Sequence, residues 1–454
     1  MKFINTTSKG NFFFRFLQNF LRHTLLVLPI AIITGSAIAF FLWSLNIAIH
    51  LRFQYKWLLY LLPFAGLLIH IIYQSLGKSS EKGNNLIMEE IHKEGGGVPW
   101  KMAPVILLTT IITHLFGGSA GREGTAVQIG GSIAALFGRW LKLKDEDLKI
   151  VLTAGIAAGF GAVFGTPLTG AIFAIEVLTL SRMKFNALLP ALVASIIGDL
   201  TVSAWQIHHT AYHIDQIAQG PYFLSDYISI DLLLLSKIIF ASVLFGLTSY
   251  FFSRMVQEIK TVFTKIFKIK WMIPIVGGLI IIGLTVLLNK PDYLSLGVDA
   301  EYPGAITIPS AFLQGGADSW SWLWKTIYTA LTLGTGFKGG EVTPLFYIGA
   351  TLGNTLSGFL NAPVSLFAAL GFIAVFSGAT NTPLACTVMG MELFGGQYFL
   401  FFAISCFIAY VFSGNLGIYS AQRIAEPEIK SIKAYFLQKF SRYKLSFKPS
   451  LKKR

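Results

Sequence analysis

The feature that most constrains this chain is a succession of apolar runs separated by short polar segments. Many runs are shorter than the roughly 20 residues that an apolar helix needs to cross a bilayer, and Gly or Pro interrupts several of them. Such discontinuous helices are typical of transporters, where broken ends meet near the bilayer midplane around a substrate. The runs lie near residues 24–50, 57–73, 103–116, 148–164, 167–180, 187–205, 232–252, 272–288, 321–333, 344–360, 364–378, 383–394 and 397–418.

The overall composition agrees with a chain that is buried in lipid. Hydrophobic residues make up 54% of the 454 residues and charged residues 13%, about half of the roughly 25% that is usual in soluble domains. This balance excludes a disordered chain, a coiled coil and most soluble enzymes. The sequence therefore predicts an all-α polytopic membrane protein.

The charged residues predict how the chain is oriented. Three basic stretches, 1–22, 254–270 and 422–454, together carry a charge of +16, so with a net charge of +14 the rest of the chain is slightly acidic. Because cytoplasmic loops are enriched in Lys and Arg, we expect both tails and the 254–270 loop to be cytoplasmic. Segments 206–229 and 291–319 carry acids and no Lys or Arg, which predicts that both are external. No basic patch is interleaved with aromatic residues, so we expect no nucleic-acid partner.

An internal repeat relates the two halves of the chain, 23–205 and 230–421. Thr-Pro-Leu at 166–168 is followed by Glu176, and the same letters at 382–384 are followed at the same spacing by Glu392, an offset of 216. Two further pairs share this offset of 216, namely Gly155 with Gly371 and Phe160 with Phe376. Two more pairs are related by an offset of 219, namely Gly130 with Gly349 and Gly121 with Gly340.

The two repeats are predicted to have inverted topology. The first apolar run of the first half follows a basic tail that is predicted to be internal. The first apolar run of the second half follows an acidic segment that is predicted to be external. In an inverted repeat, matching broken helices enter from opposite faces and meet in the middle of the membrane. We therefore expect segments 117–125 and 336–344 to lie close together at the bilayer midplane.

Two glycine-rich motifs carry the chemistry that the sequence predicts. Gly117–Thr125 precedes the apolar stretch 126–137, and its glycines allow backbone N–H groups at a helix start to approach an anion. Glu123 lies inside this positive site, where its carboxylate can occupy the anion position or leave it on protonation. Gly334–Pro344 is the repeat mate, with Pro suited to a first helical turn. The alternatives are a capped helix start and a packing turn between helices.

Two further motifs are weaker signals. The Asn amides of Gly83-Asn84-Asn85-Leu86-Ile87 offer donors at the start of another helix, although a solvated helix cap explains the same letters. Tyr419, in the segment Gly414–Ser420, places a phenol after the last apolar run, although an interfacial tyrosine is also common there.

Taken together, these motifs resemble the CLC family of chloride channels and proton-coupled anion antiporters. The resemblance covers about residues 23–421 and rests on Gly-Arg-Glu-Gly at 121–124, Gly-Gly-x-x-x-Pro at 339–344, and Tyr419. In detail the chain is similar to the fluoride-exporting bacterial branch. Thr125, the Gly-Asn-type run at 83–87 and the sequence Gly-Gly-Glu-Val-Thr-Pro carry this finer likeness.

The resemblance implies roles for individual residues. Glu123 resembles the gating glutamate that exchanges places with the anion and carries the proton, and Glu341 resembles a glutamate for internal proton entry. Many chloride/proton antiporters have a second glutamate directly after the position of Glu176, and this chain has Val177 there. The anion-binding residues implied by the resemblance are Asn84, Gly121, Arg122, Gly124, Thr125, Val342, Thr343 and Tyr419.

The function implied by the resemblance is a fluoride/proton antiporter that expels cytoplasmic fluoride. A chloride/proton antiporter or a passive anion channel of the same family is the alternative, because Val177 leaves the usual internal proton path in doubt. The family also implies a homodimer surrounded by lipid in the bacterial inner (plasma) membrane, with fluoride or chloride and protons as its small partners.

Other classes of function find less support in the sequence. An intramembrane enzyme lacks H-E-x-x-H, G-x-S-x-G and paired intramembrane Asp motifs, so we predict that the chain is not an enzyme. His208, His209 and His213 cluster in the acidic outer segment. Because no other ligand type accompanies them, we expect no metal site there, and the sequence predicts no cofactor.

Overall fold

The computed structural model describes residues 7–92, 97–143, 145–180, 185–215, 231–414 and 416–424. Most of the predicted external segment and nearly all of the predicted C-terminal tail lie outside these residues, as does Asn415. In the described residues the fold is almost entirely helical. The exceptions are β1 (Thr179–Leu180) and β2 (Arg423–Ile424), which pair in parallel.

Each predicted apolar run coincides with a helix. The helices of the first half are α1 (Thr7–Gln54), α2 (Leu62–Ile72), α3 (Asn84–His92), α4 (Met102–Leu115), α5 (Glu123–Trp140), α6 (Asp145–Phe164), α7 (Pro167–Glu176) and α8 (Leu188–Ala204). Those of the second half are α9 (Leu232–Ile266), α10 (Met272–Leu288), α11 (Ser321–Gly334), α12 (Val342–Leu360), α13 (Val364–Thr380), α14 (Pro383–Phe394) and α15 (Phe399–Phe412). Single turns of other helix types are η1 (Lys56–Leu61), η2 (Tyr73–Gly77), η3 (Lys78–Ser80), η4 (Phe185–Ala187), η5 (Ser310–Phe312) and η6 (Gly396–Tyr398).

The helices differ widely in length, as expected for a membrane protein with broken helices. Within the described residues, four helical stretches are long and apolar enough to cross a membrane: 20–54, 56–92, 146–164 and 232–266. Seven more apolar helices have 10–17 residues, too few for most of them to span a bilayer alone. The architecture is therefore all-α and polytopic, with several helices that end inside the membrane.

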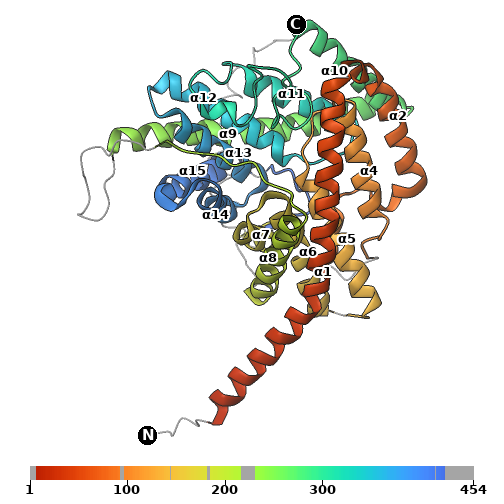
Figure 1. The fold of residues 1–454 in the computed structure, drawn as a ribbon, viewed down its shortest axis with the longest axis vertical. Helices are drawn as coiled ribbons and strands as arrows, with labels where there is room; N and C mark the ends of the chain where they lie inside the picture. The colour runs from red at the N-terminus through yellow and green to blue at the C-terminus, as the bar shows by residue number, and fades with distance from the viewer. Residues whose placement is uncertain are drawn as a thin grey trace, which may run out of the picture.

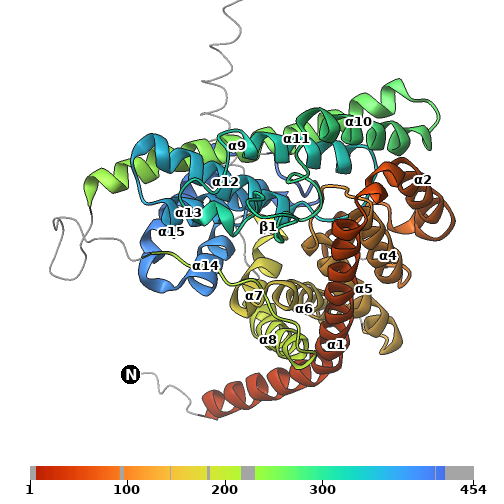
Figure 2. The same ribbon diagram turned by 45° about the horizontal axis from the view of Figure 1, so that its top comes forward.

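The two repeats form two bodies that lie side by side. Helices α1 to α8, red to yellow-green, occupy one side of the molecule, and α9 and α11 to α15, green to blue, occupy the other, whereas α10 lies beside α2 (Figure 1). The same separation persists after a 45° rotation, with α9, α10 and α11 along one edge and α6, α7 and α8 at the opposite one (Figure 2). The boundary between the bodies is therefore where residues of both repeats can meet.

The repeated glycines allow two helix pairs to cross at very short distance. A Cβ atom at Gly130 in α5 would lie 2.1 Å from the carbonyl oxygen of Gly155 in α6. The repeat mates behave alike, since a Cβ at Gly349 in α12 would lie 2.0 Å from the carbonyl oxygen of Gly371 in α13. Such separations are far inside van der Waals contact, so only glycine fits at these crossings. The sequence repeat thus marks the same helix crossing in each half.

The repeated glutamates connect the two halves directly. Glu176, the last residue of α7, accepts hydrogen bonds from the N–H groups of the second and third residues of α14, at 3.0 and 2.7 Å. Glu392 near the end of α14 accepts from the corresponding N–H groups of α7, at 2.9 and 2.8 Å, and from the hydroxyl of Thr169 at 2.6 Å. Each carboxylate therefore caps the helix start of the other repeat.

The structure differs from the sequence prediction at the basic stretch 254–270. This stretch is predicted as a loop, but helix α9 continues to Ile266 and includes most of it. Arg254 and Glu258, one helical turn apart, form an exposed ion pair with an Nε–Oε1 distance of 2.5 Å, which favours the helix. The predicted domain boundary at residue 22 falls inside α1, and the boundaries as a whole stay predictions.

The reciprocal caps predict that Glu392→Gln destabilises the protein. A hydrogen bond to a charged group contributes about 1.5–3 kcal/mol. The glutamine side chain has only one acceptor oxygen and no charge, whereas the two N–H groups at the start of α7 each bond to one oxygen of the Glu392 carboxylate. We expect a loss of stability of about that size, measured as a lower midpoint of thermal unfolding in detergent. Glu258→Gln, in an exposed pair worth roughly 0–1 kcal/mol, is the control. Equal midpoints for the two variants would contradict the capping role.

Candidate anion-binding site

The two glycine-rich motifs meet through a backbone pair. The N–H of Gly121 donates to the carbonyl of Gly340 at 2.6 Å, and the N–H of Gly340 donates to the carbonyl of Gly121 at 2.7 Å. A Cβ atom at Gly340 would lie 2.7 Å from the backbone nitrogen of Gly124, so the approach depends on the absence of side chains. The prediction that 117–125 and 336–344 lie together is confirmed.

Two helices begin at this backbone pair and point their N-termini toward each other. Glu123 is the first residue of α5, and Val342 is the first residue of α12. The first N–H groups of a helix have no partner within it, and the helix dipole adds positive potential there. The arrangement therefore concentrates hydrogen-bond donors and positive potential at one buried position, which suits an anion.

The carboxylate of Glu123 is held at this position by the second repeat. Its Oε2 accepts hydrogen bonds from the backbone N–H of Thr343 at 3.0 Å and from that of Arg122 at 3.1 Å. Its Oε1 accepts from the hydroxyl of Thr343 and lies 3.7 Å from Nε of Arg122. The side chain of Glu123 is only 1% exposed. A carboxylate of the first repeat thus occupies the donors at the helix start of the second.

Asn84 reaches the same loop from a third helix. It is the first residue of α3, as the sequence predicts for this motif. A Cβ atom at Gly124 would lie 3.2 Å from Nδ2 of Asn84, so the amide donor lies against the Gly-Arg-Glu-Gly turn. Oδ1 of Asn84 is buried without a hydrogen-bond partner. Unpaired buried polar atoms are uncommon in proteins and point to a functional group.

The remaining predicted residues on α5 and α12 have different surroundings. Thr125 is fully buried, and its hydroxyl pairs with that of Thr110 on α4 at 2.8 Å, so it fixes α5 against α4. Val342 is buried beside Thr343. Glu341 precedes α12 and is partly exposed, and its Oε2 lies 3.9 Å from the position of a Cβ atom at Gly124. Glu341 therefore lies beside the turn at Gly124, the residue that directly follows Glu123.

Tyr419 joins the site through a group of aromatic rings. It is 6% exposed, and its ring meets Phe173 edge-on with centroids 6.5 Å apart. Phe173 stacks on Phe160 at 4.2 Å, and both rings lie within 6.3 Å of Phe376. Phe376 in turn meets Phe346 on α12 at 5.2 Å. The sequence did not identify these rings as part of the site, although the matching of Phe160 with Phe376 in the repeat was a usable signal.

A small cavity opens beside Glu123 on the predicted external side. Arg122, Glu123 and Thr343 line it together with Val298 from the predicted external segment 291–319. His209, in the chain after α8, also lines it. Glu123 therefore faces described residues that come from both predicted external segments.

The loop that carries Glu341 lies against basic residues from the predicted cytoplasmic side. The Nζ atom of Lys338 lies 4.1 Å above the ring of Tyr73, and its backbone N–H donates to the Thr113 hydroxyl at 3.3 Å. Just before this loop, a Cβ atom at Gly334 would lie 2.7 Å from a side-chain carbon of Ile259, in the basic end of α9. The loop that carries Glu341 is thus packed near the basic end of α9.

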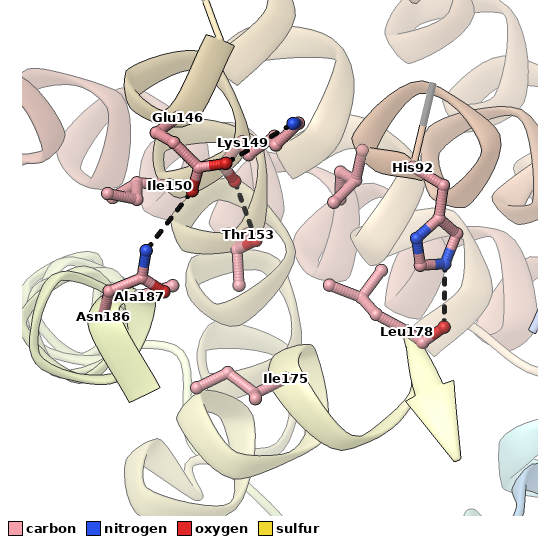
Figure 3. Close-up of a pocket in the computed structure, with 10 residues that line it drawn as sticks. His92, Glu146, Lys149, Ile150, Thr153, Ile175, Leu178, Asn186 and Ala187 are labelled. Carbon is pink, nitrogen blue, oxygen red and sulfur yellow. Dashed lines mark hydrogen bonds and ion pairs between the residues drawn. The ribbon is translucent and has the colours of Figure 1, made fainter. Parts of the chain in front are cut away.

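A separate cavity lies near the N-terminal end of α6 (Figure 3). Glu146 interacts there with Lys149 at 3.5 Å and with the amide of Asn186 at 3.3 Å, and Nε2 of His92 contacts the Leu178 carbonyl at 2.8 Å. None of the predicted site residues lines this cavity. Val177, beside Leu178, is fully buried. The position of the second family glutamate is thus filled by a buried apolar side chain.

A metal site receives no support from the described residues. No group of three or more His, Cys, Asp or Glu side chains in that part of the chain is placed to hold a metal ion. The chemistry of the site rests on hydrogen-bond donors, helix N-termini and carboxylates.

Comparisons with known proteins agree with this geometry. The family model described as "voltage gated chloride channel" matches residues 65–414. A chloride/fluoride channel protein from Pseudomonas syringae pathovar tomato is 43% identical over 88% of this chain and 86% of its own length. An H(+)/Cl(−) exchange transporter from Yersinia pestis is 26% identical over 71% of this chain and 68% of its own length.

Solved structures show the same fold. The crystal structure of a CLC-type fluoride/proton antiporter superposes with a TM-score of 0.82 at 32% identity, covering 89% of this chain and 98% of that one. A slow cyanobacterial Cl−/H+ antiporter gives a TM-score of 0.71 at 20% identity, covering 93% of this chain and 99% of that one, a likeness of fold alone. With the family model matching most of its length, the chain belongs to the CLC family of voltage-gated chloride channels and anion/proton transporters.

Proposed function

We propose that this protein is a fluoride/proton antiporter that expels cytoplasmic fluoride in exchange for protons. The observation that carries the proposal is the carboxylate of Glu123, which occupies the donors of Thr343 at the start of α12. A 43% identical relative is named a chloride/fluoride channel protein, and a similar solved structure is titled a fluoride/proton antiporter. Both names support transport of an anion rather than catalysis.

The geometry suggests how exchange is coupled. A deprotonated Glu123 and an anion compete for the same donors, because both are small negative groups that accept hydrogen bonds from Thr343. Protonation removes the charge of the carboxylate and weakens its charge-assisted bonds. The neutral side chain then leaves the site to the anion and carries its proton toward the adjacent cavity. One group therefore alternates between blocking the anion and moving the proton.

Fluoride fits the donors better than a larger halide does. Fluoride is small and strongly hydrated, so stripping its water is expensive unless short, directed donors replace it. The amide of Asn84, the hydroxyl and N–H of Thr343 and the phenol of Tyr419 are donors of this kind. The Oδ1 atom of Asn84 has no hydrogen-bond partner, so no hydrogen bond at this atom fixes the orientation of the amide.

Proton entry from the cytoplasm is assigned to Glu341 in this proposal. The family position for a second glutamate holds buried Val177, which cannot exchange a proton. Glu341 lies beside the turn at Gly124, which directly follows Glu123, and is partly exposed. A proton that enters at Glu341 has only this turn to pass before it reaches the gating carboxylate.

A chloride/proton antiporter or a passive anion channel is the second candidate. Val177 favours the channel, because it removes an acid from the usual internal proton path. The name of the 43% identical relative includes both chloride and a channel, and a 26% identical relative is named a proton/chloride exchanger.

We also propose that two copies associate in a bacterial plasma membrane with both termini in the cytoplasm. Helices α7 and α14 have 10 and 12 residues, so their ends would lie within the bilayer. The starts of both helices are capped within the chain, but their other backbone ends would be unfavourable in contact with lipid, and a second copy would cover them. Exposed apolar residues on α7, α14 and the neighbouring α8 and α15 support this face: Leu168, Leu384, Leu200 and Phe407.

The proposal predicts that Glu123→Gln abolishes proton coupling. Liposomes that hold the purified protein and fluoride should show fluoride efflux with opposing proton uptake for the wild type. Glutamine cannot carry a proton, so proton uptake should disappear in the variant, whereas Glu258→Gln on the exposed end of α9 should behave as wild type. Fluoride efflux without proton uptake in the wild type would make the protein a channel and remove the role of Glu341. Equal transport of chloride and fluoride would contradict the fluoride assignment.

Thr343→Val should weaken fluoride binding by about ten- to a hundredfold, because a hydrogen bond to a charged group contributes about 1.5–3 kcal/mol. Titration calorimetry on the purified protein measures this change. The matched control is Thr351→Val on the same helix, where the hydroxyl donates to the Tyr347 carbonyl of its own helix at 2.8 Å. If the control weakens binding as much as Thr343→Val, the hydroxyl of Thr343 is not a fluoride donor.

A further inference from the structure

We propose that His209, paired with Asp199, passes protons between the external solution and Glu123. This inference rests on the proposed antiport and assigns a residue to its external proton step. His209 lies in the chain after α8 and lines the small cavity that also contains Arg122, Glu123 and Thr343. The three histidines of this segment form one cluster in the sequence, and the structure separates them, since His208 and His213 are exposed and do not line this cavity.

The ring of His209 is held in place by packing. Its Cδ2 atom lies 2.5 Å from the position of a Cβ atom at Gly165, which ends α6 with a φ of +70°. Only glycine combines this backbone conformation with the space that the ring needs. The imidazole therefore lies directly on the end of α6, beside the cavity, in a defined position.

The polar surroundings of the ring suit a group that takes up and releases a proton. Its Nε2 atom is buried and has no hydrogen-bond partner, although Oδ1 of Asp199 lies 3.6 Å away. An unpaired buried nitrogen is unfavourable, and protonation would convert this contact into an ion pair. The side chains of His209 and Asp199 are 20% and 21% exposed, so the pair touches solvent as well as the cavity.

Few other charged groups face the ring. Asp199 approaches from α8, Arg122 and Glu123 from the start of α5, and Tyr212 from the same segment as His209. The described residues that line the cavity from α6, α12, α13 and α14 are not ionisable: Phe164, Thr343, Phe346, Phe372 and Leu393. His209 is thus the one imidazole among the described lining residues, and imidazole is the side chain whose charge ordinarily changes between about pH 5 and 8.

The proton step balances without any further reactant. A proton from water binds the imidazole, and Asp199 stabilises the imidazolium. The imidazolium then gives its proton to the carboxylate of Glu123, directly or through water, leaving a neutral imidazole and a neutral acid. The cavity volume is about 20 Å³, which is room for about one water molecule, since a water needs roughly 10–15 Å³ of such space.

The test is the pH profile of fluoride efflux from liposomes at the same pH inside and outside. Compared with wild type, His209→Gln and His209→Ala should slow proton-coupled efflux by at least about tenfold below pH 7, because a positioned acid or base contributes about 10²–10⁴-fold. Asp199→Asn should slow efflux in the same pH range, since the imidazolium loses its counter-charge. His208→Gln and His213→Gln are the matched controls and should retain the wild-type profile.

Two further readouts separate a relay from a structural role. Fluoride binding to His209→Gln, measured by calorimetry, should equal that of the wild type. Imidazole added to both sides should restore efflux by His209→Ala and leave wild type unchanged. An unaltered pH profile, weakened fluoride binding or no response to imidazole would each overturn the relay while leaving the antiport intact. A wild type that moves fluoride without protons would instead overturn the antiport and the relay together.

Discussion

The site depends on one backbone contact, the pair of hydrogen bonds between Gly121 and Gly340. These bonds, at 2.6 and 2.7 Å, hold the starts of α5 and α12 against each other without any intervening side chain. Two helix N-termini that point at one buried position create a demand for negative charge that water cannot satisfy there. The carboxylate of Glu123 meets this demand in the structure. A side chain at either glycine would separate the helices and disrupt the position that this carboxylate occupies.

The same symmetry explains why distant sequence positions become contacts. Residues that match in the repeat lie together in the structure: Gly121 with Gly340, Phe160 with Phe376, and the glutamates Glu176 and Glu392, each of which caps the helix start of the other half. The repeated glycines of α5 and α12 instead make equivalent crossings, each within its own half. A sequence repeat with inverted topology therefore predicts contacts near the symmetry axis and equivalent packing away from it.

The sequence was sufficient to predict the helices, the repeat and the meeting of the two motifs, because each depends on local letters or on a fixed offset. It did not predict that α9 continues through the basic stretch, since an exposed ion pair such as Arg254 with Glu258 stabilises a helix beyond its apolar run. The location of His209 was equally inaccessible. Only the folded chain shows that His209 lies in the cavity while its neighbour His208 is exposed. The hydroxyl of Thr125, which binds Thr110, likewise depends on packing between helices.

The backbone is nearly symmetric at the site, and its chemistry is not. At the offset of 219 that relates the two motifs, Arg122 corresponds to Glu341 and Glu123 corresponds to Val342. The acid of the second motif therefore comes one residue earlier than that of the first, ahead of the helix rather than within it. Glu123 points across to Thr343, whereas Oε2 of Glu341 lies beside the Gly124 turn. A displacement of one residue between otherwise matching motifs therefore gives the two acids different surroundings, and the proposed proton path from Glu341 to Glu123 depends on that difference.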